Sequence, residues 1–157
     1  MSIILTHPTG NRNFRYLLES LAKKRKLKYV FTNINIDTNN KLLKLLPKNL
    51  NKLLKIRDFN TLMNNTYSIS PIYEIVRVLL NKLNIPYLKP VQLKFFNNHK
   101  LYKRFSLRVS KKIKKIKNVD MVYGYEGSSL EIFQEAKKRG IKCIYELPTL
   151  YWKAKEL

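Results

Sequence analysis

The chain has 157 residues, 45% of them hydrophobic, a size and composition typical of one globular domain. Its single cysteine, Cys143, excludes an intrachain disulfide and a cysteine-based zinc site. No stretch approaches the roughly 18 apolar residues of a membrane span. The opening apolar run is too short for a signal peptide, so a cytoplasmic location is expected.

The net charge of +22 lies entirely before Asp120. Residues 1–119 carry 26 basic and 4 acidic side chains, whereas residues 120–157 carry 6 of each. Such an excess is typical of proteins that bind nucleic acid or anionic membranes. Enrichment in Lys, Asn and Ile is also what an AT-rich genome would encode on any tolerant surface, so both origins of the charge stay open.

The first 34 residues predict a strand, a helix and a second strand. Ser2–Leu5 is a short apolar run that enters a loop, Thr6–Gly10, and so predicts a buried strand. The β-branched and aromatic run Tyr29–Ile34 predicts the second strand. Between them a helix capped by Asn11 or Asn13 is expected, because apolar residues recur on one helical face: Phe14, Leu17, Leu18, Leu21 and Ala22.

The middle of the chain is predicted to be mainly helical. Leucines on both sides of Pro47 predict two short helices, and Ile56–Phe59 predicts a third strand. Pro71 can open a helix whose apolar stripe continues to Leu83. A longer helix, 98–117, is indicated by one apolar face: Leu101, Phe105, Val109, Ile113 and Ile116.

The last part predicts a strand, a helix and a strand over Val119–Tyr125, Ser128–Arg139 and Ile141–Glu146, with Gly140 ending the helix. A strand–helix–strand unit of this length places its two strands parallel in one sheet. The predicted fold class is therefore α/β, a Rossmann-like open parallel sheet flanked by helices.

The loop His7–Asn13 is the first candidate site, because ligands of open parallel sheets bind beyond the carboxyl ends of the strands. Gly10 lets the backbone approach a ligand, and the following helix N-terminus offers N–H groups to an anion. A tight turn with an asparagine cap would explain Gly10 but not His7 or Arg15. The loop lacks the GxGxxG pattern of dinucleotide sites.

The loop Gly124–Ser129 is the second candidate site. Glu126 follows a strand, where a carboxylate can bind sugar hydroxyls or act as a general base. Alternatively, its charge and a cap at Ser128 or Ser129 stabilise the next helix N-terminus. Both interpretations stay open.

Three segments resemble the N-terminal domain of bacterial family 4-type glycosyltransferases, which have the two-Rossmann-domain GT-B architecture. They are HPTGNRNFR, PIYEIVRVLLNKLNIP and VYGYEGSSLEIFQEAKKRGIKCIYELPTLYW. The resemblance begins near Ile3, runs to the end of the chain and is looser over Asn35–Asn65. In the family pattern an acidic residue usually follows the glutamate; here Gly127 occupies that place, which affects the expected loop geometry.

The resemblance implies that residues 1–157 form the acceptor-side domain of a hexosyltransferase-type enzyme. Such an enzyme transfers a sugar from a nucleotide-sugar co-substrate to a glycan or lipid-linked acceptor of the cell envelope. No metal or other cofactor is expected, because helix dipoles and basic side chains stabilise the leaving diphosphate.

Site residues follow from the same resemblance. The residues expected to line the cleft near the donor phosphates are Thr9, Gly10 and Asn11. The catalytic candidates are Glu126 and His7. The acceptor-side candidates are Asn13, Arg15, Tyr125 and Ser128.

The donor-binding half of the family architecture has no counterpart in these 157 residues. The chain alone is therefore expected to lack turnover and to require a donor-binding domain or chain. The basic middle of the chain is expected to face a charged glycan acceptor or the anionic inner face of the membrane, where the protein would sit peripherally. An alternative is a basic, non-enzymatic nucleic-acid-binding domain, for which aromatics such as Tyr102 and Phe105 interleave with lysines. Those aromatics fall largely on helical core faces and no nucleic-acid motif occurs, so nucleic acid is not expected as a partner. A third hypothesis, a docking subunit using Tyr151 and Trp152, also stays open.

Overall fold

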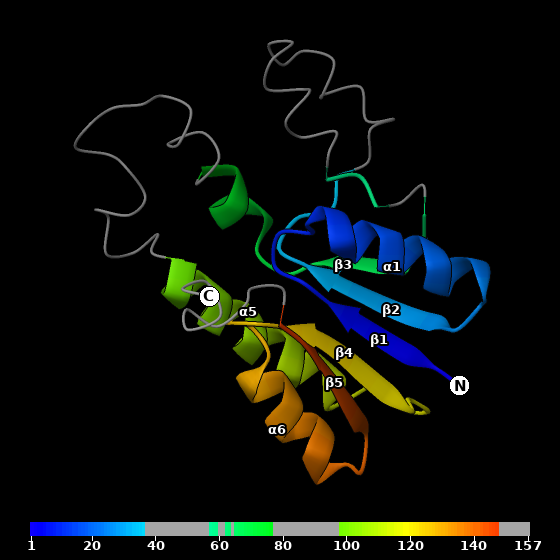
Figure 1. The fold of residues 1–157 in the computed structure, drawn as a ribbon. Helices are drawn as coiled ribbons and strands as arrows, with labels where there is room; N and C mark the ends of the chain where they lie inside the picture. The colour runs from blue at the N-terminus through cyan, green and yellow to red at the C-terminus, as the bar shows by residue number, and fades with distance from the viewer. Residues whose placement is uncertain (37–56, 60–61, 64, 77–97, 148–157) are drawn as a thin grey trace, which may run out of the picture.

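Five parallel strands form the centre of the fold (Figure 1). The structure is a computed structural model and describes residues 1–36, 57–59, 62–63, 65–76 and 98–147. The strands are β1 (Ile3–Thr6), β2 (Leu27–Thr32), β3 (Thr66–Ser68), β4 (Met121–Tyr125) and β5 (Lys142–Glu146). Their order is β3-β2-β1-β4-β5, and every neighbouring pair is parallel. The predicted Rossmann-like α/β fold is confirmed.

Helices cover both faces of this sheet (Figure 1). Helix α1 (Arg12–Lys23) packs on one face, and α5 (Asn98–Ile113) and α6 (Leu130–Lys138) pack on the other. The core on the α1 face consists of Leu5, Phe14, Leu18, Val30, Phe59 and Tyr125. The core on the α5 and α6 face includes Ile4, Phe31, Phe105, Val109, Ile113, Val122, Ile132 and Ala136. The apolar stripes predicted for α1 and α5 face the sheet: Phe14 and Leu18 of α1 and Leu101, Phe105, Val109 and Ile113 of α5 are buried, and the other stripe residues are partly buried.

Two helix ends share one backbone geometry. After α6, the Ile141 N–H donates to the Ala136 carbonyl at 3.0 Å while Gly140 adopts a φ of 67°. After α1, the Lys26 N–H donates to the Leu21 carbonyl at 3.1 Å. Each bond joins an N–H to the carbonyl five residues earlier, which is the hydrogen bond of a Schellman motif. This motif requires a residue in the left-handed region. The predicted stop at Gly140 is confirmed.

The third strand lies elsewhere than predicted. Arg57–Phe59 form a turn and loop, and β3 is the strand that pairs with β2. The Phe59 N–H donates to Asn35 Oδ1 at 3.0 Å, and the Phe59 ring is fully buried in the α1-face core. The apolar pattern of this segment therefore reflects the anchoring of a loop, not sheet pairing.

The long helix also ends earlier than predicted, at Ile113 instead of residue 117. The Lys114 N–H still bonds four residues back, to the Ser110 carbonyl, but the next two N–H groups bond three residues back: Lys115 to the Lys112 carbonyl and Ile116 to the Ile113 carbonyl, each at 3.0 Å. This tighter spacing ends the α-helix, and Asn118, at a φ of 55°, turns the chain toward β4.

Other predictions lie outside the described residues. They are the two helices around Pro47, the stripe beyond residue 76 of the helix that opens at Pro71, and the segment that contains Tyr151 and Trp152. Of the helix that opens at Pro71, residues 71–76 are described and are helical.

Candidate functional site

The carboxyl ends of β1 and β4 form the centre of the candidate site. These neighbouring strands are parallel, and the chain runs outward from them in opposite directions, to β2 and β3 on one side and to β5 on the other. Open sheets bind their ligands at such a switch point. The two loops singled out from the sequence, His7–Asn13 and Gly124–Ser129, leave these two strand ends.

His7 joins the two loops. Its ring centroid lies 4.5 Å from that of Tyr125 in an edge-to-face contact and 5.3 Å from that of Phe14. Its Nδ1 accepts the backbone N–H groups of Thr9 at 3.1 Å and Gly10 at 2.8 Å. The side chain therefore fixes the conformation of the first loop while its ring faces the end of β4.

Burial sets the protonation state of His7, and the same two bonds set its tautomer. Burial lowers its pKa from 6.5 to about 4, so the imidazole is neutral at neutral pH. Because Nδ1 accepts two hydrogen bonds, the ring proton of the neutral form is on Nε2. His7 can thus donate a hydrogen bond from Nε2, but it is not arranged to take a proton there.

Gly10 and Asn11 shape the turn into α1. Gly10 has a φ of 67°, and a Cβ atom at this position would lie 2.3 Å from Cζ of Phe59. Asn11 caps the helix, its Oδ1 accepting the Phe14 N–H at 2.8 Å, which confirms the predicted capping. Because the N–H groups of Thr9 and Gly10 bind His7, an anion would be bound by the first N–H groups of α1 instead.

Arg15 and Asn13 differ in their surroundings. The Arg15 guanidinium donates to the Asp58 carbonyl at 3.1 Å, and its Cζ lies 4.7 Å from the Phe59 ring centroid. These contacts hold the loop around Phe59 against α1. Asn13 is exposed on the first turn of α1.

Tyr125 contributes a buried hydroxyl to the site. The residue is 2% exposed, and its Oη has no hydrogen-bond partner among the described residues. Its pKa is raised first by burial, then by the charge of Glu146, and by an interaction with the Glu146 carboxylate that falls short of a well-formed hydrogen bond. An unpartnered buried hydroxyl is costly, so this group suits a ligand or a water molecule.

Glu146 is a site residue that was not selected from the sequence. Its Oε2 accepts the Tyr123 hydroxyl at 2.6 Å, and burial together with this bond raises the pKa of Tyr123 to about 12. Its backbone carbonyl accepts the Glu126 N–H at 3.1 Å, which ties the second loop to the end of β5. Two sequence signals bear on it: Glu146 lies at the end of a predicted strand, and it belongs to the last segment that resembles the family 4-type enzymes.

Glu126 itself is exposed at the start of the second loop. Among the described residues its carboxylate makes neither a hydrogen bond nor an ion pair. Gly127 follows with a φ of 78°, which an acidic residue in that place would not readily adopt. The hydroxyls of Ser128 and Ser129 are buried and donate to the Tyr125 carbonyl at 3.4 and 2.7 Å. The serines therefore close the turn, and Glu126 is left available.

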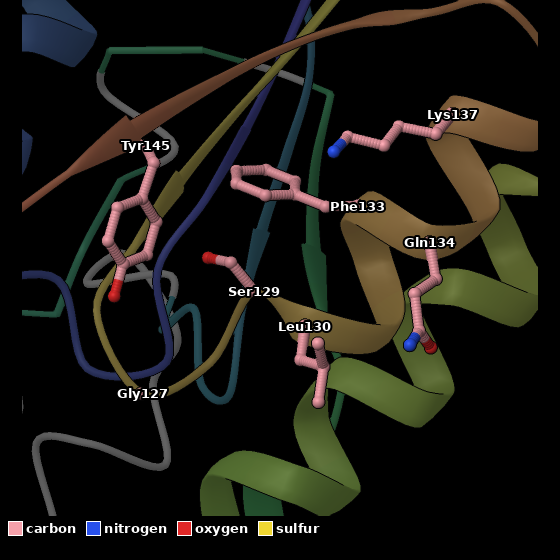
Figure 2. A pocket seen from close by; sticks show the side chains of 7 residues that line it. All are labelled: Gly127, Ser129, Leu130, Phe133, Gln134, Lys137 and Tyr145. Carbon is pink, nitrogen blue, oxygen red and sulfur yellow. The ribbon is translucent and has the colours of Figure 1, made fainter.

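A cavity of about 400 Å³ opens beside this loop (Figure 2). It is lined by Gly127, Ser129, Leu130, Phe133, Gln134, Lys137 and Tyr145. Figure 2 shows Ser129 and Phe133 projecting from the α6 side toward Tyr145, whose ring centroid lies 6.1 Å from that of Phe133. A cavity of this size, with aromatic walls and few polar groups, falls in the range of small-molecule sites.

Asn33 is a second residue that the sequence did not single out. It is fully buried just after β2, and both polar atoms of its amide lack a partner among the described residues. Its N–H donates to the Pro8 carbonyl at 2.9 Å, and its carbonyl accepts the Ser70 N–H at 3.0 Å. Asn33 thus extends the carboxyl edge of the site toward β3. From the sequence alone, Asn33 is only predicted to be part of the strand Tyr29–Ile34.

A buried ion pair flanks this end of the sheet. Arg57 donates to Oε1 of Glu74 at 2.7 Å, and Glu74 is 0% exposed. Arg108 of α5 donates to Ser70 Oγ at 2.8 Å. These contacts hold together the loop around Arg57, the helix 71–76 and α5 behind Asn33.

Comparison with known proteins found no matching family model, no matching curated protein and no matching solved structure. Within the described ranges, no three His, Cys, Asp or Glu side chains gather closely enough to hold a metal ion. In the same part of the chain, no helix is long and apolar enough to cross a membrane.

Proposed function

We propose that this chain is the acceptor-side domain of a glycosyltransferase and uses a nucleotide-sugar bound by a separate domain or chain. The observation that carries the proposal is the contact of a neutral His7 with Tyr125 at the switch point of a Rossmann-like sheet, where the exposed Glu126 follows Tyr125 in the chain. The resemblance of the same loops to family 4-type enzymes supports it. The acceptor would be a glycan or a lipid-linked sugar, with the domain in the cytoplasm at the inner membrane face.

The transfer needs one proton acceptor and one set of hydrogen-bond donors. An acceptor hydroxyl oxygen attacks the anomeric carbon, the bond from that carbon to the diphosphate breaks, and the hydroxyl proton passes to Glu126. His7, through Nε2–H, and Tyr125, through Oη, orient the acceptor. The exposed first turn of α1, after Thr9–Asn11, faces the leaving diphosphate, whose charge the helix dipole stabilises.

The cavity of Figure 2 offers a place for the rest of the acceptor. Its ring pair, Phe133 and Tyr145, presents apolar faces, and Ser129 and Lys137 supply polar groups at its wall. Since Gly127 is part of both the loop and the cavity wall, an acceptor in the cavity would approach Glu126.

Tyr125→Phe separates a role in binding from a role in folding. Removing an unpartnered buried hydroxyl should leave the free energy of unfolding unchanged or raise it by up to about 1 kcal/mol. The same change should weaken the binding of acceptor glycans, measured by saturation-transfer NMR against a panel of mono- and disaccharides. A variant that loses stability and keeps its glycan binding would contradict the proposed role.

Glu126→Gln tests the proton acceptor. The purified chain alone should release no nucleoside diphosphate from a panel of nucleotide-sugars, and the addition of a compatible donor-binding domain should be required for release. In that two-component assay Glu126→Gln should lower kcat by roughly 100-fold or more, whereas Glu135→Gln on α6 should leave it unchanged. Transfer by the isolated chain, or an equal response of both variants, would count against the proposal.

A further inference from the structure

A second cavity, of about 220 Å³, lies on the α5 face of the sheet beside its edge strand β3. It is lined by Tyr29, Phe31, Tyr67, Lys112, Lys115 and Ile116. The rings of Phe31 and Tyr67 are stacked, with centroids 5.5 Å apart and planes at 27°, and the centroid of Tyr29 lies 5.6 Å from that of Tyr67. Phe31 is 1% exposed, whereas Tyr67 keeps 42% of its surface exposed. The cavity therefore presents an open aromatic face.

Positive charge surrounds this aromatic face. Lys112 Nζ lies 5.4 Å from the Tyr67 ring centroid, and Lys115 lines the same cavity. Lys28, beside Tyr29, donates to the carbonyls of Lys117 and Asn118 at 2.8 and 3.0 Å, which holds the segment between α5 and β4 next to β2. Segment 98–119 contains no acidic residue. These surroundings favour a ligand that has both an aromatic ring and negative charge.

The shape of the cavity favours a small planar group. Its volume is below the roughly 300–1,000 Å³ of sites that enclose a drug-sized ligand, so a single ring system is what fits. A recessed aromatic surface admits a ring, whereas membrane attachment would call for aromatic side chains that protrude. Stacking of bases on exposed aromatic rings beside lysines is how single-stranded nucleic acid is bound without sequence preference.

We propose that this cavity binds a nucleotide, with the base stacked on Tyr67 and the phosphate held by Lys112 and Lys115. The shared chemistry, an aromatic base carrying a phosphate, can come from a free nucleotide or from a single strand. These rings belong to β2 and β3, whereas Phe105 of α5, one of the aromatics that the sequence pointed to, is buried in the core. The inference does not depend on sugar transfer, because its residues lie on the face opposite α1 and His7.

The test uses fluorescence anisotropy of a labelled ten-residue thymidine oligonucleotide with the full 157-residue chain. Tyr67→Ala should weaken binding by roughly 5- to 150-fold, the effect of losing one stacked base, and Tyr67→Phe should retain it. A strand of equal charge that lacks bases should bind weakly and should not respond to Tyr67→Ala. Competition by thymidine monophosphate would assign the site to a free nucleotide; competition only by the oligonucleotide would assign it to a strand.

Matched variants separate a site from general attraction to a basic protein. Tyr16 on α1 is 55% exposed and lies 5.6 Å from the Arg12 guanidinium, so Tyr16→Ala removes a comparable aromatic–cation pair from the other face. Lys112→Gln with Lys115→Gln should reduce the slope of log affinity against log salt by about 1.4, as loss of two phosphate contacts predicts. Lys23→Gln with Lys24→Gln removes the same charge from the end of α1 and should change the slope less.

Three results would overturn the inference. They are equal binding of the base-free strand, equal losses in the Tyr16 and Tyr67 variants, and equal salt slopes in the two lysine pairs. Binding to phosphatidylserine vesicles that depends on Tyr67, with no such dependence for the oligonucleotide, would also overturn it, in favour of a membrane surface. Circular dichroism of Tyr67→Phe and Tyr67→Leu shows whether a loss of oligonucleotide binding comes from unfolding. Tyr67→Leu keeps an apolar side chain but has no planar ring, so a folded Tyr67→Leu chain should still bind weakly.

Discussion

His7 shows how one side chain can serve the fold and constrain the chemistry. By accepting two backbone N–H groups through Nδ1, it holds the first loop closed, and this leaves only Nε2–H to face a ligand. The sequence identified His7 as unusual for a plain turn. It did not predict that both loop amides are already bound, because that depends on the rotamer and burial of the ring. Glu126, by contrast, is exposed at the position expected from the strand end.

The buried imidazole of His7 predicts a specific dependence of stability on pH. Its pKa is about 4 in the folded chain and 6.5 when unfolded, so the unfolded chain binds the proton first as the pH falls. The contribution is complete above about pH 6.5 and is lost toward pH 4, amounting to about 3 kcal/mol. Urea unfolding at several pH values between 4 and 7 measures this loss.

His7→Asn is the control for this prediction. The asparagine oxygen can accept the two N–H groups in place of Nδ1, but it does not titrate. The variant should lose less stability than the parent chain between pH 6.5 and pH 4, once the titration common to both is subtracted. An identical loss in the two proteins would show that His7 is not the group responsible.

At the scale of elements, the ends of the helices and strands position the site. The buried faces of α1 and α5 were predicted from periodicity alone, since one apolar stripe can face only one sheet. The sequence did not predict that β3 pairs with β2, because β3 has only three residues and carries little pattern of its own. Phe59, which the sequence predicts to be part of a strand, instead fills the space next to Gly10. A glycine there is required by packing, independently of any ligand.

The end of α6 offers a clean measurement of backbone strain. Gly140 has a φ of 67°, and an added Cβ would meet nothing within 4 Å, so a substitution changes conformational strain and not packing. Gly140→Ala should destabilise the chain by about 1 kcal/mol, because an L-residue is strained in the left-handed region. Gly140→Asn should cost less, since asparagine tolerates that region. Thermal and urea unfolding compare the two; equal stability of Ala, Asn and Gly at this position would rule out strain as the determinant.

For the whole molecule, the excess of positive charge sets the response to salt. With a net charge of +22, like-charge repulsion opposes the compact state, and salt reduces it as the screening length falls from about 30 Å at 0.01 M to about 10 Å at 0.1 M. The Tm should therefore rise over this range of KCl. Replacement of the five lysines in 111–117 by glutamine lowers the net charge to +17 and should make the rise shallower. A Tm that is flat or falls with KCl in the parent chain would contradict this view of the charge.

The sequence by itself determined the class of fold, most of the elements and the two loops that meet at the site. These features follow from local periodicity, caps and turn residues, which act over a few positions of the chain. The tertiary structure alone decided that Tyr125 and Asn33 carry buried polar groups without partners among the described residues, and that Glu146 lies beside Tyr123. It also decided that Tyr29, Phe31 and Tyr67 gather beside Lys112 of α5 and Lys115 just after it. Each of these depends on which strands become neighbours, and contacts between residues far apart in the chain leave no local pattern.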